Sequence, residues 1–281
     1  MAWSLKNRWK QRVMKKLASL IVLASLISIS VNARSQNDPE ENTFEYKSVE
    51  NKAFQAGEML KYKFAYGFLN AGEAVLEVKK SDRKIQNREI LHVVGRGYSI
   101  SAFDWFFKVR DRYETYIDKE GIFPWLFVRR INEGGYSKEQ DYKFYQHKGK
   151  VVDEDDKTYD IPYGIQDMLS SFYYARTIDF SNAKKGDVFE FQSFVDEEVY
   201  PLRIKYAGDK TIKVDKGKFN CMVFHPVVQE GRIFEDDDDL TVYITKDENK
   251  IPILAKAKIL VGSIRMELID YDNLANPVAK K

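Results

Sequence analysis

The sequence predicts an all-β protein, mainly antiparallel, whose strongly twisted sheet curls into a barrel or half-barrel with one amphipathic helix. From residue 57 onward, most stretches alternate apolar and polar residues and are separated by Gly, Asp and Asn, which is typical of hairpins. One stretch, residues 165–176, instead repeats apolar residues every three or four positions, as an amphipathic helix does. It divides the strands into two sets, 57–158 and 187–272. So many strands rarely remain in a flat open sheet.

The N-terminus has the three parts of a secretory signal peptide. Residues 6–16 carry six basic and no acidic side chains, and residues 17–31 are apolar and uncharged. Val31 and Ala33 then place small residues before a cleavage site. We therefore expect a signal peptide over residues 1–33. An uncleaved membrane anchor is the alternative, although the apolar run is short for a membrane span.

The rest of the domain organisation follows from this signal. Met1 or Met14 is the translation start, and the mature chain is expected to begin at Arg34. The 248 residues after the signal can form one large β domain. We expect three segments: a flexible leader over 34–53, a single β-rich domain over 54–272 and a C-terminal tail over 273–281.

The charge balance of the mature chain argues against nucleic-acid binding. The whole chain has 45 Lys and Arg against 43 Asp and Glu, but after residue 33 the balance is 39 against 43, a net charge of −4. A mildly acidic chain lacks the basic footprint of a nucleic-acid-binding protein. We expect no transmembrane span in the mature chain. Its only cysteine, Cys221, excludes an intramolecular disulfide.

Two predicted turns align three aromatic strands between residues 107 and 145. A three-residue loop at 119–121, with Gly121 in the left-handed position, would place Asp111 opposite Arg129 and Tyr113 opposite Phe127. A two-residue loop at 134–135 would place Phe127 opposite Tyr142. A slip of one residue would turn the aromatic side chains to water. The concave face predicted in this way holds eight ligand-binding candidates, namely Asp111, Tyr113, Trp125, Phe127, Arg129, Gln140, Tyr142 and Phe144.

This face and the segment before it each have two interpretations. The face is either a filled core in which Asp111 and Arg129 form a satisfied ion pair, or the apolar wall of a ligand cavity with a few polar groups. The segment "SAFDWFF" is too rich in aromatic residues for strict alternation. It is either a lip at the barrel mouth, contacting lipid or a partner through Phe103, Trp105 and Phe106, or a bulged edge strand.

No pattern in the sequence predicts a catalytic residue, a cofactor or a metal site. His92, His147 and His225 are far apart and fit no close metal-ligand spacing. No nucleophile elbow or phosphate loop is present. The acidic runs 153–156 and 235–239 would be either calcium ligands or solvated turns, and neither has the glycine and terminal glutamate of an EF-hand loop.

Short motifs spread along the chain carry a family resemblance, among them "AGEMLKY", "YGFLNAG" and "IPYGIQDMLSSFYYAR". Their order from residue 54 to 271 resembles an exported bacterial family known as domain of unknown function 3108. The resemblance implies an exported β-rich domain of Gram-negative envelopes and carries no established activity. The matching residues are Gly57, Glu58, Tyr62, Tyr66, Gly67, Ala71, Gly72, Arg112, Tyr113, Tyr116, Ile117, Asp118, Pro162, Gln166, Asp167, Leu169, Ser170, Tyr173, Arg176, Asp247, Pro252 and 261–263.

These features together predict a periplasmic, non-enzymatic binding domain for an apolar or lipid-like ligand. The alternative is a scaffold that joins an envelope protein in cell-envelope assembly, through edge strands and the aromatic lip. An enzyme is the third hypothesis. A closed and filled interior would favour the scaffold, and an open apolar cavity would favour the binding domain.

Overall fold

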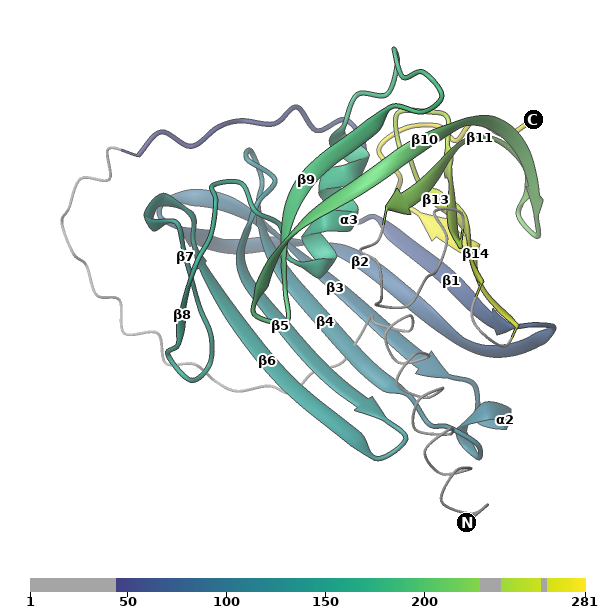
Figure 1. Cartoon of the computed structure of the whole chain (residues 1–281), viewed down its shortest axis with the longest axis horizontal. Coiled ribbons are helices and arrows are strands. Elements are labelled where there is room, and N and C mark those ends of the chain that lie inside the picture. Colours follow the sequence, from purple (N-terminus) through teal and green to yellow (C-terminus); the bar gives the residue numbers. More distant parts are fainter. Residues whose placement is uncertain (1–43, 228–238, 259–261) are drawn as a thin grey trace.

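The computed structural model describes residues 44–227, 239–258 and 262–281, in which one fourteen-stranded antiparallel sheet curls around a helix (Figure 1). The helix inside the curl is α3 (Met168–Thr177), and two single turns are α2 (Ser101–Asp104) and η1 (Gln146–Lys148). The predicted curled all-β fold is confirmed. The strands are β1 (Met59–Tyr66), β2 (Leu69–Ile85), β3 (Arg88–Ser99), β4 (Arg110–Asp118), β5 (Pro124–Glu133), β6 (Tyr136–Tyr145), β7 (Lys150–Val152), β8 (Thr158–Asp160), β9 (Val188–Val195), β10 (Glu198–Val214), β11 (Gly217–Val227), β12 (Leu240–Thr245), β13 (Pro252–Lys258) and β14 (Ser263–Asp272).

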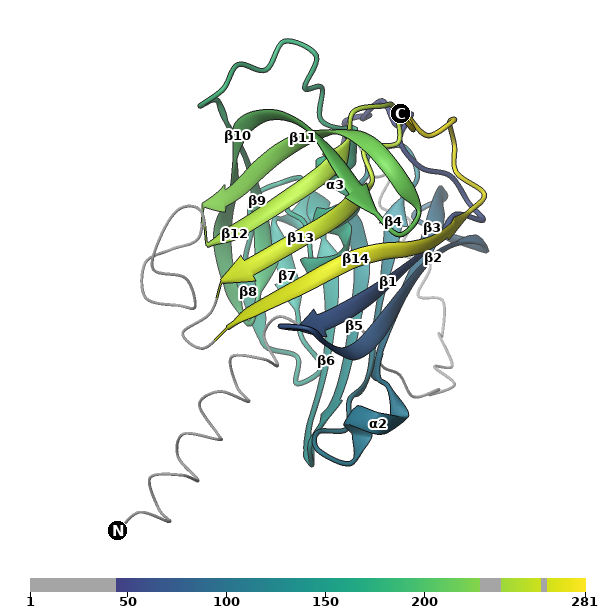
Figure 2. The same ribbon diagram turned by 90° about the vertical axis from the view of Figure 1, so that its right-hand side faces the viewer.

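The sheet consists of two meanders, β1–β8 and β9–β14, which are joined where the first strand, β1, pairs with the last strand, β14. Strand β1 pairs with both β2 and β14, so the first and last strands lie side by side at the centre of the sheet. The spatial order runs from β8 down to β1 and then from β14 down to β9. The two predicted sets of strands are these two meanders. They form two arms that curve towards each other with α3 between them (Figure 2).

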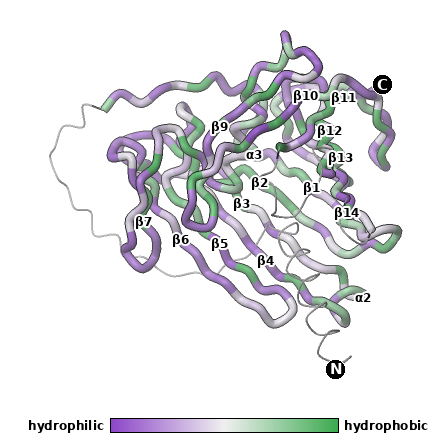
Figure 3. Tube along the Cα trace, viewed as in Figure 1, coloured by the Kyte–Doolittle hydropathy of each residue, from purple (hydrophilic) through white to green (hydrophobic). Residues whose placement is uncertain are grey.

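Hydrophobic and hydrophilic residues alternate along the strands (Figure 3). Because successive side chains point to opposite faces, this alternation gives the sheet one apolar face. In β4, Tyr113, Thr115 and Ile117 are buried towards α3, while Arg112 and Tyr116 on the other face are partly exposed. The main core therefore fills the concave side, between the sheet and the helix. Burying one face of each strand in this way stabilises an antiparallel sheet whose other face meets water.

The segment before α3 links the first arm to the second. The backbone N–H of Gln166 donates to the carbonyl of Gln192 at 2.9 Å, and the N–H of Phe194 donates to the carbonyl of Gln166 at 2.7 Å. These bonds add a short parallel bridge to the edge of β9. The edge strands β8 and β9 do not pair with each other, so the sheet is curled and not closed.

Both terminal segments pack on the sheet where they are described. Tyr46 stacks on Phe123, and Phe54 packs edge-to-face on Tyr173 of α3. Near the other end, the N–H of Asn276 donates to the side chain of Asn249 at 2.9 Å. The predicted signal peptide lies outside the described residues. Among the helices that the structure describes, none has the length and apolar content needed to cross a membrane.

Candidate functional site

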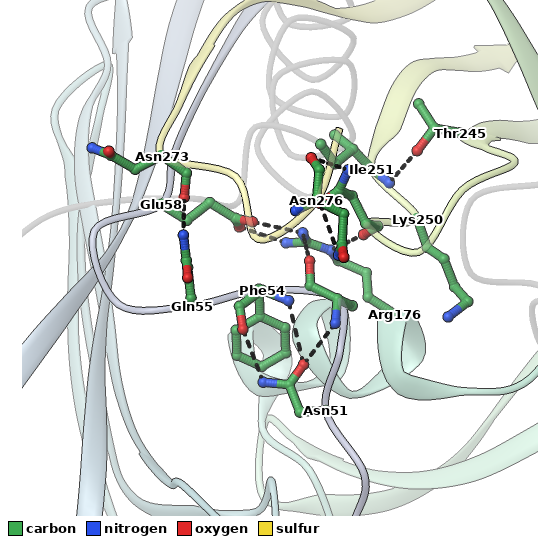
Figure 4. A network of polar contacts seen from close by, with 12 residues as sticks. Asn51, Phe54, Gln55, Glu58, Arg176, Thr245, Lys250, Ile251, Asn273 and Asn276 are labelled. Carbon is green, nitrogen blue, oxygen red and sulfur yellow. Dashed lines mark hydrogen bonds and ion pairs between the residues drawn. The ribbon is translucent and has the colours of Figure 1, made fainter. Parts of the chain in front are cut away.

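The helix α3 is fixed by a buried ion pair with the start of the sheet. Arg176, in its last turn, donates to both carboxylate oxygens of Glu58 at 2.6 and 2.7 Å (Figure 4). The same guanidinium donates to the carbonyls of Ala53 and Asn249, each at 2.9 Å. The side chains of Arg176 and Glu58 are almost completely buried. The bidentate geometry and the additional hydrogen bonds offset the cost of removing both charges from water.

The first turn of α3 is fixed by a second buried carboxylate. Asp167 accepts hydrogen bonds from the N–H groups of Leu169 and Ser170, both at 2.7 Å, and forms a capping box with Ser170. Its other oxygen accepts from the hydroxyl of Thr115 on β4 at 2.5 Å. Burial raises the pKa of Asp167 to about 6, although these hydrogen bonds oppose the shift. Both helix ends are thus tied to the sheet by residues that carry the family resemblance.

The helix presents two different faces to the two arms. Leu169 and Tyr173 are fully buried in the main core with Ile165 just ahead of the helix. The spacing of the apolar residues over 165–176 predicts that Ile165, Leu169 and Phe172 dock together on the sheet, but Phe172 is only half-buried and lies at the edge of this core. With Met168, Phe172 instead faces the second arm. The helix therefore has apolar residues left over after its core contacts are made.

These remaining residues line an apolar groove between α3 and the second arm. The groove has a volume of about 240 Å³. Its polar side chains are Ser171, Arg176 and Lys250, at the helix and at the β12–β13 turn. The apolar ones come from six elements and the loop after α3, and include Met168, Phe172, Phe180, Phe191, Leu202, Ile204, Phe224, Val242, Ile244 and Pro252. None of the eight ligand-binding candidates predicted from the sequence lines this groove.

A wider polar cavity of about 770 Å³ adjoins the groove. Phe180 and Lys250 line both spaces. The cavity is lined by both signs of charge, because Asp179 and Glu248 stand near Lys250 and Lys52. The ammonium group of Lys250 makes no ion pair with any residue that the structure describes, and Figure 4 shows it pointing away from the Glu58–Arg176 network. The groove and the cavity therefore form one continuous site, in which the groove is the apolar part and the cavity is the polar part.

The predicted register of the first aromatic hairpin is wrong by two residues. Tyr113, and not Asp111, lies opposite Arg129, and Thr115 lies opposite Phe127. Trp125 is the extra residue of a bulge, because Tyr116 pairs with Leu126 and Ile117 pairs with Pro124. The second predicted turn is confirmed: Arg129 lies opposite Gln140, and Phe127 lies opposite Tyr142.

The first turn differs because its glycine has a different role. Ile122, with φ of 48°, takes the left-handed position predicted for Gly121. Gly121 is needed for space instead, since a Cβ there would lie 2.2 Å from the ring of Phe123. Asp118 stabilises the longer loop by accepting from the N–H groups of Glu120 and Gly121. Local sequence does not distinguish these two reasons for a glycine.

Four of the predicted aromatic candidates share one buried cluster on the concave face. Tyr113, Phe127, Tyr142 and Phe144 are all buried there, and Phe194 of β9 packs on Tyr142 and Phe144. Protein side chains thus fill this part of the interior, as in the filled-core interpretation. Trp125 does not join the cluster.

The bulge turns Trp125 to the convex face. There it packs against Phe123 and Tyr46, and its indole N–H donates to Asp118 at 3.2 Å. It belongs to a small cluster that also contains Ile90 and lies on the side of the sheet opposite α3. The two-residue loop at 134–135 also predicts Trp125 opposite Phe144, and this pairing is wrong because the paired residues of β5 and β6 begin at Leu126 and Lys143.

The predicted ion pair between Asp111 and Arg129 does not form. Arg129 donates to Gln140 at 2.9 Å and to Asp196, at the β9–β10 turn, at 2.7 Å. Asp111 instead accepts from the N–H of Asn132 at 2.8 Å and lies beside the buried carboxyl of Glu133. Burial, together with that second carboxyl, raises the pKa of Asp111 to about 9. The register predicts a polar row of Asp111, Arg129 and Gln140; Arg129 and Gln140 are neighbours as predicted, but Asp111 has other partners.

The predicted lip is a one-turn helix between two internal strands. Trp105 and Phe106 are exposed, whereas Phe103 is half-buried. The alternative of a bulged edge strand is wrong, because β3 and β4 on either side of α2 both lie inside the sheet. The next residue, Phe107, turns inward.

The described residues contain no group of three or more His, Cys, Asp or Glu side chains arranged for a metal ion. His92 contacts Glu114 at 2.5 Å and stacks on Tyr116 on the convex face. Cys221 is buried, and burial raises the pKa of its thiol to about 12, so it is not activated. The acidic run 235–239 falls mostly outside the described residues.

Comparison with known proteins identifies a family and a fold. The sequence model of a protein family of unknown function, DUF3108, matches residues 61–269. No curated protein matches the chain by sequence. A β-barrel-like protein of the DUF1849 family from Brucella abortus superimposes with a TM-score of 0.52 and 15% identity, over 78% of this chain and 99% of that one. This likeness shows the fold alone.

A more distant structure is that of a Bacteroides fragilis protein described as a candidate exported protein with a YmcC-like fold. It has a TM-score of 0.29 and 11% identity, and the match covers 81% of this chain and 100% of that one. A candidate lipoprotein of Parabacteroides distasonis has a TM-score of 0.33 and 9% identity, over 82% and 100% of the two chains.

Proposed function

The chain belongs to the DUF3108 family of unknown function, and within it we propose a periplasmic, non-enzymatic protein that binds a lipid-like molecule in the groove between α3 and the second arm. The observation that carries this proposal is the groove itself. Its walls are almost wholly apolar, and its volume of about 240 Å³ lies just below the range of about 300–1,000 Å³ typical of small-molecule pockets. Such a space suits one slim apolar chain.

The arrangement of α3 supports a groove that stays open. Both helix ends are fixed, by Asp167 to β4 and by Arg176 to Glu58, so the helix cannot easily settle onto the second arm. The face left towards the groove includes Met168 and Phe172. Methionine is flexible and polarizable and adapts to irregular apolar partners. A ligand chain would therefore gain burial that the protein does not provide for itself.

The adjoining cavity supports an amphiphile over a purely apolar ligand. It opens from the groove at Phe180 and Lys250, so a chain in the groove would place its head group there. Because Asp179 and Glu248 lie among the lysines, the cavity suits a zwitterionic or neutral polar head better than a bare anion. A lysophospholipid with a zwitterionic head has this chemistry.

Two adjacent positions on β10 provide a matched test. Leu202 lines the groove, whereas Arg203 is exposed and paired with Glu190 outside it. Binding is measured by the fluorescence of N-phenyl-1-naphthylamine, which rises in apolar surroundings, and by its displacement with lysophosphatidylcholine. Leu202→Gln should weaken binding about tenfold or more, since it removes apolar contact and buries an amide. Arg203→Gln should bind as the unmodified protein does. Equal binding by both variants would place the probe elsewhere.

The scaffold alternative receives less support from the sheet edges. Strand β8 has only three residues, and β9 is already bridged by Gln166. Short or occupied edges offer little backbone for pairing with a second protein. Displacement of the probe by lysophosphatidylcholine would favour the binding domain, whereas a groove that takes up no probe would contradict it.

A further inference from the structure

Exposed aromatic side chains gather at one end of the first arm. The β1–β2, β3–β4 and β5–β6 connections all lie at this end (Figures 1 and 2). Each carries an exposed aromatic residue, and Phe68 and Trp105 are 95% and 93% exposed. We call this set the aromatic rim; it consists of Phe68, Leu69, Trp105, Phe106 and Tyr136.

The opposite end of the same strands is different. Its β2–β3 connection is Gln86 and Asn87, and its β4–β5 loop begins with Lys119 and Glu120. Tyr145, at this opposite end of β6, is only 37% exposed and packs edge-on against His147. The most exposed aromatic side chains of the first arm therefore lie at the other end, on the rim. An exposed apolar patch of this kind marks a contact surface.

The tips of the rim are held in place by the protein. The carboxylate of Asp104 in α2 accepts from Arg110 and from the hydroxyl of Ser99. The N–H of Gly134, in the β5–β6 turn, donates to the carbonyl of Lys108 at 2.8 Å, which joins two of the three connections. Fixed aromatic groups lose little conformational freedom when they become buried in a partner.

A cavity with three arginines lies directly behind the rim on the convex face. It has a volume of about 660 Å³ and is lined by Arg96, Arg110 and Arg112, with Ser101 of α2 at its border. Its lining also contains two carboxyl groups, those of Asp111 and of Glu73, and Glu73 is paired with Lys61 at 2.7 Å. Arg96 and Arg112 lie directly opposite each other on neighbouring strands. Like charges in directly opposed positions are destabilising unless an anion intervenes.

Arg112 has the weakest partners among these arginines. Its closest carboxylate, Glu114, lies 3.3 Å away and is contacted more closely by His92, at 2.5 Å. Its Nε has no hydrogen-bond partner, although it is buried. By contrast, Arg96 and Arg110 have close ion pairs with Glu77 and Asp104. A guanidinium in this state can donate to a phosphate oxygen as a further partner.

We propose that the aromatic rim docks on a lipid membrane and that the arginine cavity receives the phosphate of an anionic lipid. Aromatic side chains prefer the interface between lipid and water, and cations just behind them meet the headgroups. The rim residues stand on three separate tips, whereas hot spots of protein interfaces cluster in one central packed patch. The rim is remote from the groove in sequence and in lining, so this proposal stands apart from the proposed function.

Vesicle flotation tests the docking, with vesicles of phosphatidylcholine alone or with phosphatidylglycerol added. The exported protein is used, because the apolar stretch 17–31 would itself enter a bilayer. We expect stronger binding to the anionic vesicles and a blue shift of Trp105 emission, while Trp125 stays buried. Replacing Phe68, Trp105 and Phe106 together by Ser should lower partition about tenfold or more. Val188→Ser, which changes an exposed apolar residue outside the rim, should bind normally.

A second variant tests the arginine cavity. Arg112→Gln should lower the preference for anionic vesicles about threefold or more and leave binding to phosphatidylcholine unchanged. Arg96→Gln, at a more exposed position, gives the same test if the first variant folds poorly. Two results would overturn the proposal: no binding of the unmodified protein to either vesicle, or equal binding by the triple Ser variant. Normal uptake of N-phenyl-1-naphthylamine by the rim variants would show that the groove is unaffected.

Discussion

The ion pair between Arg176 and Glu58 should be the strongest single anchor of α3, and it can be tested by a double-mutant cycle. The single changes are Arg176→Met and Glu58→Leu. Each removes one partner and leaves the other buried, because both side chains are almost completely excluded from water. An uncompensated buried charge costs roughly 3–5 kcal/mol. That is a large share of the roughly 5–15 kcal/mol that stabilises a typical domain.

The double variant should recover part of this loss. Two apolar residues of similar size remove both charges, so the penalty of an unpaired charge disappears. Recovery stays incomplete, because the carbonyls of Ala53 and Asn249 each lose a guanidinium donor. Unpaired buried acceptors cost about 1–3 kcal/mol each. We therefore expect a coupling energy of about 2–4 kcal/mol between the two positions.

Urea unfolding, followed by the emission of the buried Trp125, measures these free energies. Trp125 is suitable because it packs on the convex face, away from the substituted positions. The expected order of stability is unmodified protein, double variant, then either single variant. Additive single effects, with coupling below about 0.5 kcal/mol, would refute the view that the pair acts as one anchor.

Two further predictions concern the first arm. The raised pKa of Asp111, about 9 in the folded state, means that folding favours its protonated form. The contribution of Asp111 to the free energy of unfolding should therefore be fully present below its unfolded pKa of about 4 and be lost as pH rises through its raised folded pKa. Asp111→Asn should flatten this dependence in urea titrations at several pH values, and an unchanged slope would count against it. Gly121→Ala should destabilise by about 1–3 kcal/mol through its clash with Phe123, and a neutral effect would show that the ring moves aside.

The strands were predictable because their pattern is local. Alternation of apolar and polar residues gives the strands and the concave face, and the glycine pair at 134–135 gives the β5–β6 register. The spacing of Leu169 and Tyr173 gives the helix. These signals lie within short stretches of sequence, so no knowledge of distant contacts is needed.

The register predicted for the first hairpin, β4–β5, was wrong because the true register depends on a contact outside the hairpin. The bulge at Trp125 is stabilised by packing on Tyr46, which is about eighty positions earlier in the chain. Because the true register of β4 and β5 is shifted by two residues, Asp111 does not lie opposite Arg129. Arg129 donates instead to Asp196 of the second arm. Neither contact has a signature in the residues around the turn.

The groove could not be predicted because its walls come from α3 and from strands that follow it over residues 191–252, far from the helix in the chain. One signal was present: Met168, Phe172 and Ala175 form a second apolar stripe at helical spacing, beside the stripe used for the core. Such a stripe indicates a second partner surface. Which strands face it, and how much space they leave, depends on how the two arms curl.

The central claim, that the groove holds a lipid-like molecule, is tested most directly by native mass spectrometry of the protein purified from the cells that produce it. We expect an added mass on part of the protein that disappears after extraction with organic solvent, and an amphiphile with one apolar chain in the extract. Leu202→Gln should carry much less of it, and Arg203→Gln should carry as much as the unmodified protein. A protein without any added mass that also takes up no lysophosphatidylcholine, or equal loading of both variants, would contradict the claim.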